Sequence, residues 1–286
     1  MLVPIDSPAD PRVADYANLR DRQLAARAGL GDRPGVFLAE GELVVRTLID
    51  SGRRVRSVLI TPTRLESMRD AIDRLPAEVP VYLAGPGVMD GVVGFHIHRG
   101  VLAAGDRWPE PTLAEVLARA TRVLVLEGLA NHDNVGGLFR VAAALGGVEA
   151  TAQDGGASSE RSRHRAAVVL SPGTCDPLYR KAIRVSMGSA LRVPFATATP
   201  WPAVLADVRR AGFRLVALTP GAGAVPIERL DPSGPRVAVM LGAEGPGLSA
   251  EAMAMADVRV RIPIDPSVDS LNVVTAGAIA LHRLRG

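Results

Sequence analysis

Three short segments carry polar residues beside apolar runs, where a folded chain could use them to hold an anion or a small ligand. The first, residues 127–147 (EGLANHDNVGGLFRVAAALGG), passes from an apolar run through a polar loop into a helical pattern. Asp133 or Asn134 can cap this helix, and the free amides at a helix start form an anion site. Arg140 lies six residues after Asn134, so the two side chains point about 120° apart on a helix. The plainer reading is a capped helix with one surface arginine.

The second segment, residues 237–249 (VAVMLGAEGPGLS), is an apolar strand followed by glycines around Glu244. Gly242, Gly245 and Gly247 let the backbone approach a ligand closely and permit positive φ. Ligands of α/β sheets bind at the carboxyl ends of strands, where this loop is expected. The alternative is a turn that only connects a strand to a helix.

The third segment, residues 261–281 (RIPIDPSVDSLNVVTAGAIAL), leads from a strand through an Asp/Pro/Ser loop into the final helix. Ser270 is a suitable N-cap for that helix. Taken alone, Ser270 and Asn272 are explained as capping residues.

The elements that must position these segments are predicted by apolar patterning. Short, nearly continuous apolar runs are typical of strands covered on both faces, which indicates a parallel sheet with helices on each side. The predicted strands are residues 122–127, 167–170, 214–218 and 237–241, and the helices are residues 135–145, 178–184, 202–211 and 271–284. The last helix is so apolar that we expect it to be largely buried.

A smaller α/β domain of about ninety residues is predicted upstream, a usual size for an independent unit. Its predicted helices are residues 42–51 and 65–75, and its strands are residues 55–60, 79–83 and 101–104. We therefore expect a flexible tail (1–13), the small domain (14–105), a Pro-containing linker (106–112) and the larger domain (113–286).

Composition excludes several classes of protein. With 286 residues, 48% apolar and 22% charged, the chain is not intrinsically disordered. Its apolar runs are too short to span a membrane, and its start lacks a secretory signal. The single cysteine, Cys175, excludes internal disulfides and cysteine-built zinc sites. The five histidines lack metal-ligand spacing, so we expect no metal site. Because the apolar runs are short we expect no membrane, and because a single cysteine suits a reducing compartment we expect a cytoplasmic location.

Charge is unevenly distributed along the chain. Of the 33 basic residues 32 are arginine, and the net charge of +3 falls entirely within residues 106–286. Arginine grips phosphate with a planar fork that lysine lacks. A G+C-rich genome would produce the same bias. Aromatic residues are only 3%, which disfavours recognition by rows of stacked bases.

Together the three segments resemble the SpoU/TrmH family of RNA 2′-O-methyltransferases, in the SPOUT superfamily. The resemblance runs from about Tyr16 to the C-terminus. Its motifs are Asn134-Val135-Gly136 with Arg140, Gly242-Ala243-Glu244-Gly245 with Gly247, and Ile262-Pro263 with Ser270-Leu271-Asn272-Val273. Upstream, Leu38–Gly41 and His98–Val101 resemble the family's N-terminal substrate-binding domain, which is similar to ribosomal protein L30e.

The resemblance implies an α/β protein with a small L30e-like RNA-binding domain and a deep trefoil-knotted methyltransferase domain. It implies a homodimer that uses S-adenosyl-L-methionine to methylate a ribose 2′-hydroxyl of RNA, with rRNA favoured over tRNA. The implied catalytic residues are Arg140, Asn134, Glu244, Ser270 and Asn272. Those implied for the cofactor are Leu241, Gly242, Gly247, Ile262, Pro263, Leu271 and Asn272. Basic residues expected to contact RNA are Arg53, Arg54, Arg56, Arg99, Arg161, Arg163 and Arg165.

The implied reaction needs a proton acceptor. Arginine has a pKa above about 12, so Arg140 is a poor base. We expect Arg140 to orient groups and stabilise charge, with a substrate phosphate relaying the proton. His132 lies in the loop of the first motif, where it can meet substrate.

Two features depart from the family pattern. Val274 stands where the family often has a second serine, and about fifteen residues (151–165) look inserted. The insertion is basic and could contact phosphates, or it could be a passive solvated loop. The main alternative function is an RNA-binding module with a catalytically inactive SPOUT domain. A dehydrogenase is disfavoured because no G-x-G-x-x-G follows a strand.

Overall fold

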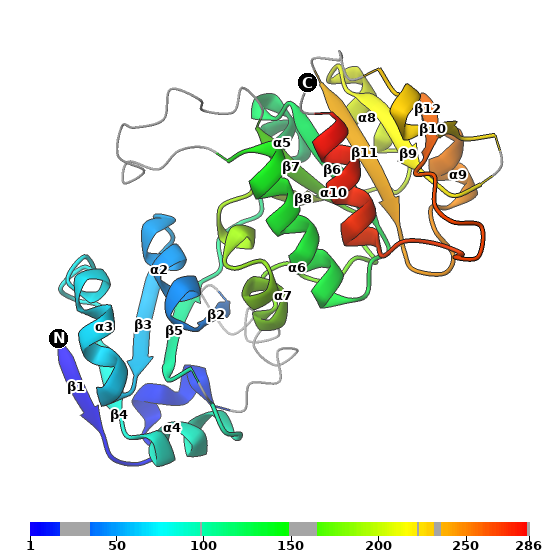
Figure 1. The fold of residues 1–286 in the computed structure, drawn as a ribbon. Helices are drawn as coiled ribbons and strands as arrows, with labels where there is room; N and C mark the ends of the chain where they lie inside the picture. Colours follow the sequence, from blue (N-terminus) through cyan, green and yellow to red (C-terminus); the bar gives the residue numbers. More distant parts are fainter. Residues whose placement is uncertain (18–34, 98, 149–164, 222, 232–235, 285–286) are drawn as a thin grey trace. The chain divides into compact units, whose positions relative to one another are not determined.

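The computed structural model describes residues 1–17, 35–97, 99–148, 165–221, 223–231 and 236–284 (Figure 1). They form two compact units. One comprises Met1–Pro109 with Leu178–Leu191, and the other Glu110–Pro177 with Arg192–Gly286. The segment Leu178–Leu191 falls inside the expected 113–286 domain by sequence but joins the first unit by contact. One reason is Glu40, which is 5% exposed and accepts a hydrogen bond from Arg180 Nη1 at 2.5 Å.

The first unit is built on a five-stranded sheet of order β1-β4-β3-β5-β2. Its strands are β1 (Leu2–Ile5), β2 (Val36–Glu40), β3 (Val55–Ile60), β4 (Val81–Ala84) and β5 (Val101–Asp106). β5 runs antiparallel to both of its neighbours, whereas β1, β4 and β3 are parallel. The expectation of a flexible tail over residues 1–13 is therefore wrong, because β1 pairs with β4.

Helices and a buried tyrosine complete the first unit. The helices of this unit are η1 (Pro11–Tyr16), α2 (Glu42–Asp50), α3 (Pro62–Ile72), α4 (Pro86–Val93), α7 (Arg180–Val185) and η4 (Ser189–Leu191). Tyr16 is fully buried, its hydroxyl lies 2.8 Å from Ser57 Oγ, and it accepts from the Ala104 amide at 3.3 Å. Burial raises the pKa of Tyr16, so the phenol stays neutral and holds η1 to the sheet.

The second unit is built on a seven-stranded parallel sheet of order β10-β12-β9-β11-β6-β7-β8. Its strands are β6 (Arg122–Glu127), β7 (Ala166–Leu170), β8 (Phe195–Thr197), β9 (Arg214–Leu218), β10 (Val225–Pro226), β11 (Val237–Gly242) and β12 (Val258–Arg261). Along the chain, β7 and then β8 are added on one side of β6, and the strands that follow lie on the other side of β6. The order thus reverses between β6 and β11, and such a switch point is where parallel sheets bind ligands.

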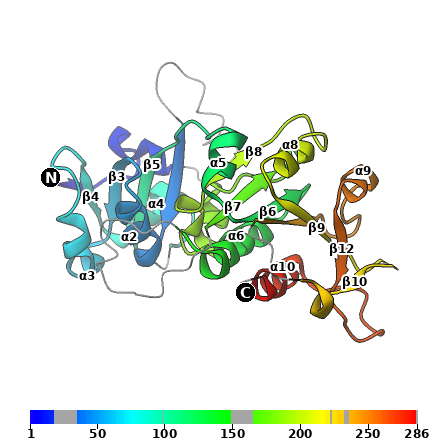
Figure 2. The same ribbon diagram turned by 90° about the horizontal axis from the view of Figure 1, so that it is seen from above.

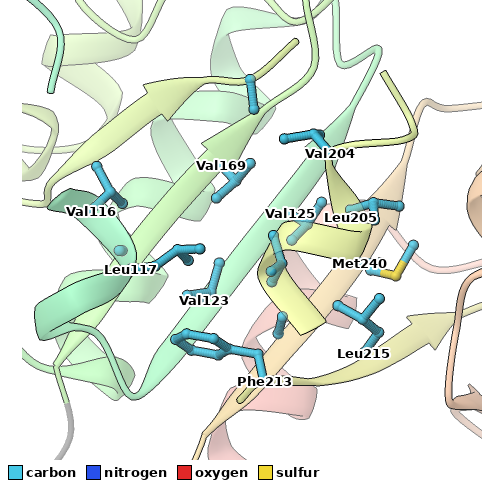
Figure 3. Close-up of a cluster of buried hydrophobic side chains, with 14 of the residues drawn as sticks. Val116, Leu117, Val123, Val125, Val169, Val204, Leu205, Phe213, Leu215 and Met240 are labelled. Carbon is cyan, nitrogen blue, oxygen red and sulfur yellow. The ribbon is translucent and has the colours of Figure 1, made fainter. Parts of the chain in front are cut away.

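Both faces of this sheet carry helices, as the sequence predicted. Figure 2 shows α5 (Leu113–Arg119) and α8 (Leu205–Arg210) on one face, and α6 (His132–Val141) and α10 (Val273–Arg283) on the other. A π-helical turn (Ala142–Gly146) extends α6, and α9 (Ala250–Ala254) follows β11. The core under α5 and α8 consists of apolar side chains from both layers, including Leu117, Leu205 and Met240 (Figure 3).

The helices that carry the first and third motifs are each capped by an asparagine. α6 is capped by Asn131, whose side chain accepts from the Asp133 amide at 2.9 Å. α10 is capped by Asn272, which accepts from the Val274 amide at 2.9 Å. The prediction of Asp133 or Asn134 as the cap of α6 is therefore wrong. Of the two caps considered for the final helix, Asn272 is confirmed and Ser270 is not. Because Asn131 takes the capping role, the side chain of Asn134 is free to point elsewhere.

α10 is held against α6 and the sheet along one face. Val274 sits over Gly137, where an added Cβ would lie 2.8 Å from its Cγ2. At the far end, Arg122 is 3% exposed and donates from Nε and Nη2 to the Leu284 carbonyl at 3.0 and 2.8 Å. A charge-assisted bond of this kind satisfies a helix C-terminus. The expectation of a largely buried final helix holds for this face alone, since Thr275 is exposed.

Candidate active site

The three sequence motifs meet through a side-chain network. Asn134 donates from Nδ2 to Glu244 Oε1 at 2.7 Å, and Asn272 donates from Nδ2 to Asn134 Oδ1 at 3.1 Å. Asn272 Nδ2 also lies 3.5 Å from Glu244 Oε1. Asn134 is only 5% exposed, and a buried amide is stable only with partners such as these. One polar cluster therefore joins the starts of α6 and α10 to the loop after β11.

A pocket of about 450 Å³, here called the strand-end pocket, opens beside this cluster. It lies at the carboxyl ends of β9, β11 and β12 and against the start of α10. The predicted residues that line it are Leu241, Gly242, Glu244, Gly247, Ile262, Ser270, Leu271 and Asn272. Pro263 is not among its lining residues. The volume and the mainly apolar walls with a few polar groups suit a small organic ligand.

The wall formed by Gly242 is backbone only. A Cβ at this position would fall far inside van der Waals contact of the Gly247 carbonyl carbon and the Leu248 amide nitrogen. Gly247 has φ +74° and donates its amide to the Ala243 carbonyl at 2.9 Å, which curls the loop back on itself. Only glycine fits position 242, so a ligand there meets backbone groups.

The strand-end pocket also includes residues that sequence reasoning missed. Leu218 ends β9, and Thr219 and Pro220 follow it. Val260 lies in β12, and Ile264 lies in the loop after that strand. The strand over residues 214–218 was predicted, and the rule that ligands bind at strand ends would have indicated Thr219.

A second pocket of about 460 Å³, here called the loop pocket, lies on the other side of the cluster. Its lining residues are Gly128, Leu129, Ala130, Asn131, His132, Asn134, Ala243 and Glu244. Ala243 and Glu244 also line the strand-end pocket, so one pair of residues separates the two spaces. Two reactants bound in these pockets would therefore meet at the Asn134–Glu244–Asn272 cluster.

Glu127, at the end of β6, supports the loop that follows β11. Its Oε1 accepts from Trp201 Nε1 at 2.6 Å and from Ser249 Oγ at 2.7 Å, while Oε2 accepts from the Ser249 amide at 2.9 Å. Ser249 is in turn the N-cap of α9. With its oxygens engaged in this way, Glu127 fixes the glycine loop and is explained as a structural residue.

Other chemistries find little support in this region. Burial, with a contribution from Asp176, raises the pKa of Cys175 to about 12, so the thiol is protonated at neutral pH. Across the parts of the chain that the structure describes, no three His, Cys, Asp or Glu side chains gather as a metal site. Within the same residues, no helix is both long and apolar enough to cross a bilayer.

The structure does not bring Arg140 to the other predicted catalytic residues. Arg140 lies in the last turn of α6, is exposed, and lines neither the strand-end pocket nor the loop pocket. In a single chain it is therefore separate from Asn134, Glu244 and Asn272.

The arginines predicted to contact RNA differ in their surroundings. Arg53 lies 3.7 Å from the Trp108 ring centroid, and Arg56 forms ion pairs with Asp106 and Asp15, so both are engaged within the first unit. Arg54 is 82% exposed beside Asp106, and Arg99 is exposed as well. Arg161 and Arg163 lie outside the described residues.

Arg165 lines a third pocket, here called the arginine pocket, together with Arg119 and Arg192. It has a volume of about 420 Å³ and lies near the amino ends of β7 and β8, at the edge of the sheet opposite the strand-end pocket. Its walls include Val116, Ala120 and Pro194. Glu115 also lines it, so three cations and one carboxylate share the space.

Comparison with known proteins identifies relatives over nearly the whole chain. The model of the SpoU rRNA Methylase family matches residues 161–282. The uncharacterized tRNA/rRNA methyltransferase Rv0881 of Mycobacterium tuberculosis is 43% identical over 277 residues, which are 96% of this chain and 88% of the relative. The 23S rRNA (guanosine(2553)-2′-O)-methyltransferase RlmP of Bacillus subtilis is 25% identical over 283 residues, covering 99% of each.

The fold has a similar solved counterpart. The structure of an AdoMet-bound rRNA methyltransferase from Sinorhizobium meliloti superposes with a TM-score of 0.76 at 22% identity, over 99% of this chain and 97% of that one. The α/β architecture with a mainly parallel sheet is thus shared. Given the sequence relatives, the chain belongs to the SpoU family of tRNA/rRNA methyltransferases.

Proposed function

We propose that the chain is an S-adenosyl-L-methionine-dependent RNA methyltransferase that modifies a ribose 2′-hydroxyl, with rRNA as the favoured substrate. The observation that carries the proposal is the Asn134–Glu244–Asn272 cluster between two pockets of ligand size. A two-substrate reaction needs such a boundary. The name of the Bacillus subtilis relative, a 23S rRNA 2′-O-methyltransferase, supports the choice of reaction and RNA class.

The strand-end pocket fits S-adenosyl-L-methionine. Leu241, Ile262 and Leu271 supply apolar walls suited to a nucleobase, while the Gly242–Gly247 backbone and Asn272 supply polar groups. Because a Cβ at Gly242 would collide with the Gly247 and Leu248 backbone, glycine at this position lets the loop close tightly beside the pocket. When bound, the cofactor supplies an electrophilic methyl group on a sulfonium centre. The expected contribution of Pro263 is then indirect, through the backbone of the loop.

The residues of this chain would orient the ribose. Glu244 and Asn134 face the loop pocket, so their carboxylate and amide groups can hold a sugar hydroxyl in near-attack geometry. Ser270, at the rim of the strand-end pocket, would keep the donor in line with that hydroxyl.

The enzyme would act as a homodimer, with Arg140 completing the site of the partner subunit. The outward faces of α6 and α10 support this arrangement. Ala144 lies four residues after Arg140, in the π-helical turn that extends α6, and is exposed. Val141 on α6 and Ala278 and Ile279 on α10 are partly exposed. A face of small and apolar residues on paired helices suits a symmetric contact. An Arg140 that lies outside both pockets of its own chain could then act across the contact.

We also infer that the second unit contains the deep trefoil knot of the family. β11 lies between β6 and β9, and α10 returns from the far edge of the sheet to lie against α6 and β11. This return of the chain past the 237–249 loop supports the inference. The first unit would serve as the L30e-like RNA-binding domain.

RNA binding would involve the arginine pocket. Replacing Arg119, Arg165 and Arg192 together by glutamine should weaken RNA binding and flatten its salt dependence. The slope of log K against log salt should fall by about 0.7 to 0.9 for each phosphate contact removed. Fluorescence anisotropy with deproteinised rRNA from 50 to 300 mM salt measures both quantities.

The matched control for this experiment is Arg210→Gln. Arg210 is also an exposed arginine of the second unit, but it pairs with Asp207 on α8 and lines none of the three named pockets. An unchanged slope in the triple variant, with the control also unchanged, would remove the arginine pocket from the RNA-binding surface.

Calorimetry and methyl transfer test the proposed function. Titration with S-adenosyl-L-methionine should show a site that weakens when the loop at Gly242 is displaced, and labelled methyl groups should reach deproteinised RNA. Binding of RNA without either signal would contradict the proposal and favour an RNA-binding module with an inactive SPOUT domain.

A further inference from the structure

We propose that His132 accepts the proton of the ribose 2′-hydroxyl, a role that rests on the proposed function and completes it. The methyl acceptor is a very weak acid, and Arg140 cannot serve as a base at neutral pH because a guanidinium holds its proton too tightly. From the sequence we expect a relay through a substrate phosphate for this step, but a side chain that lines the loop pocket can take the proton directly as the new bond forms.

One imidazole, that of His132, belongs to a residue that lines the loop pocket, next to the residues shared with the strand-end pocket. His132 is the first residue of α6, is partly exposed, and lines the loop pocket together with Asn134 and Glu244. Glu244 also lines the strand-end pocket. A ribose in the loop pocket would therefore have the methyl donor on one side and the His132 ring within the same cavity.

The other candidates around the two pockets are poorer bases. Among the described lining residues, His132 and Glu244 alone carry side chains that exchange a proton near neutral pH or below. Glu244 Oε1 already accepts from Asn134 at 2.7 Å, and a carboxylate is a weaker base than an imidazole. His132 is thus the group best suited to general base catalysis at this site.

The charges that face His132 come from several elements. The amino end of α6 disfavours the imidazolium and so keeps the ring neutral, ready to accept a proton. Glu244 across the pocket and Asp133 beside it on α6 favour the imidazolium once it forms. Asp176 lies in the loop where Cys175 donates its amide to the Leu129 carbonyl, which is also part of the pocket.

The step balances without any further reactant. The 2′-oxygen forms a bond to the methyl carbon as its proton passes to a ring nitrogen of His132. The methyl–sulfur bond breaks with its electron pair on sulfur, so the positive sulfonium becomes a neutral thioether. The positive charge ends on the imidazolium, which loses its proton to water before the next turnover.

Single-turnover methyl transfer as a function of pH tests this assignment. Labelled S-adenosyl-L-methionine and deproteinised total RNA from a bacterial strain lacking the gene for this chain are the reactants, with enzyme in excess. The wild-type rate should rise with pH through one ionisation at about pH 6 to 7. His132→Gln should be slower by about 100-fold and lack that ionisation. Imidazole added to His132→Ala should restore part of the rate, which a merely structural role would not explain.

Two further measurements distinguish the loss of a proton acceptor from the loss of cofactor binding. The ring signal that disappears from the NMR spectrum in His132→Gln should titrate at the pH of the kinetic ionisation, without cofactor or RNA. Calorimetry should show unchanged cofactor binding in both variants. His96→Gln is the matched control, because His96 is exposed beside Asp90 in the first unit and lines neither the strand-end pocket nor the loop pocket.

The outcomes are distinct. Wild-type methyl transfer with an unchanged rate and pH profile in His132→Gln would overturn the role of His132 and leave the proposed function in place. Failure of the wild type to label any RNA would overturn both.

Discussion

Replacing Arg140 with alanine is expected to lower methyl transfer by about 100- to 1000-fold, the usual cost of removing a group that stabilises developing charge. The affinity for S-adenosyl-L-methionine should stay within about twofold, because exposed substitutions away from a site rarely perturb it. Arg140 is exposed and lines neither the strand-end pocket nor the loop pocket. Initial rates at saturating cofactor and a calorimetric titration measure the two quantities.

Arg140→Lys and mixed subunits sharpen this prediction. Lysine keeps the charge but loses the planar fork, so Arg140→Lys should remain strongly impaired. Dimers that combine one Arg140→Ala subunit with one Glu244→Ala subunit should recover activity at one of their two sites if Arg140 acts across the dimer. A near-wild-type rate for Arg140→Lys in a folded protein would remove Arg140 from catalysis.

Replacing Gly242 with alanine is expected to displace the loop that forms one wall of the strand-end pocket. The added methyl would occupy the position of the Gly247 and Leu248 backbone, so the loop must move. Overpacking of this kind costs about 1 to 3 kcal/mol of folding stability. If cofactor binding has to restore the displaced loop at that cost, the affinity falls by about 5- to 140-fold. Calorimetry measures the affinity, and a thermal melt reports any loss of stability.

Gly223→Ala is the matched control outside the strand-end pocket. A Cβ at Gly223 would meet nothing within 4 Å, although its φ of +85° costs some backbone strain. The loss of affinity should therefore be clearly smaller than for Gly242→Ala. Equal effects of the two substitutions would mean that backbone strain, and not displacement of the pocket wall, decides binding.

Much of the second unit could be predicted from apolar patterning alone. β6, β7, β9 and β11 are continuous apolar runs because both faces of the sheet are covered, and each was expected within a few residues. β1 was missed because four residues at a chain start carry little pattern. It becomes a strand only by pairing with β4, about eighty residues further on.

The candidate site could be predicted in composition but not in geometry. Asn131, Asp133 and Asn134 can each cap a helix, so the sequence could not decide which of them does. The choice of Asn131 leaves Asn134 to reach Glu244, which lies 110 residues away along the chain. Helix propensity is local, whereas this partner is fixed by the order of strands in the sheet.

The arginine bias has a partly structural explanation. Arg122 donates to the carbonyl that ends α10, and Arg236 donates to carbonyls of Leu117 and Ala211 at the ends of α5 and α8. Arg283 reaches the carbonyl of Leu230 at 2.9 Å. Several donors on one planar group suit such positions better than an ammonium group does. Arginine content alone was therefore a weak predictor of RNA binding.

Mapping of the methylated nucleotide tests the central claim most directly. Deproteinised RNA from a strain lacking the gene is incubated with the purified chain and labelled S-adenosyl-L-methionine, then digested to nucleosides and mapped by primer extension at low nucleotide concentration. Label is expected on a ribose 2′-oxygen at one position, in 23S rRNA before any tRNA, and at a rate about 100- to 1000-fold lower with Arg140→Ala. Label on a base, or no label in rRNA or tRNA from a protein that binds the cofactor, would contradict it.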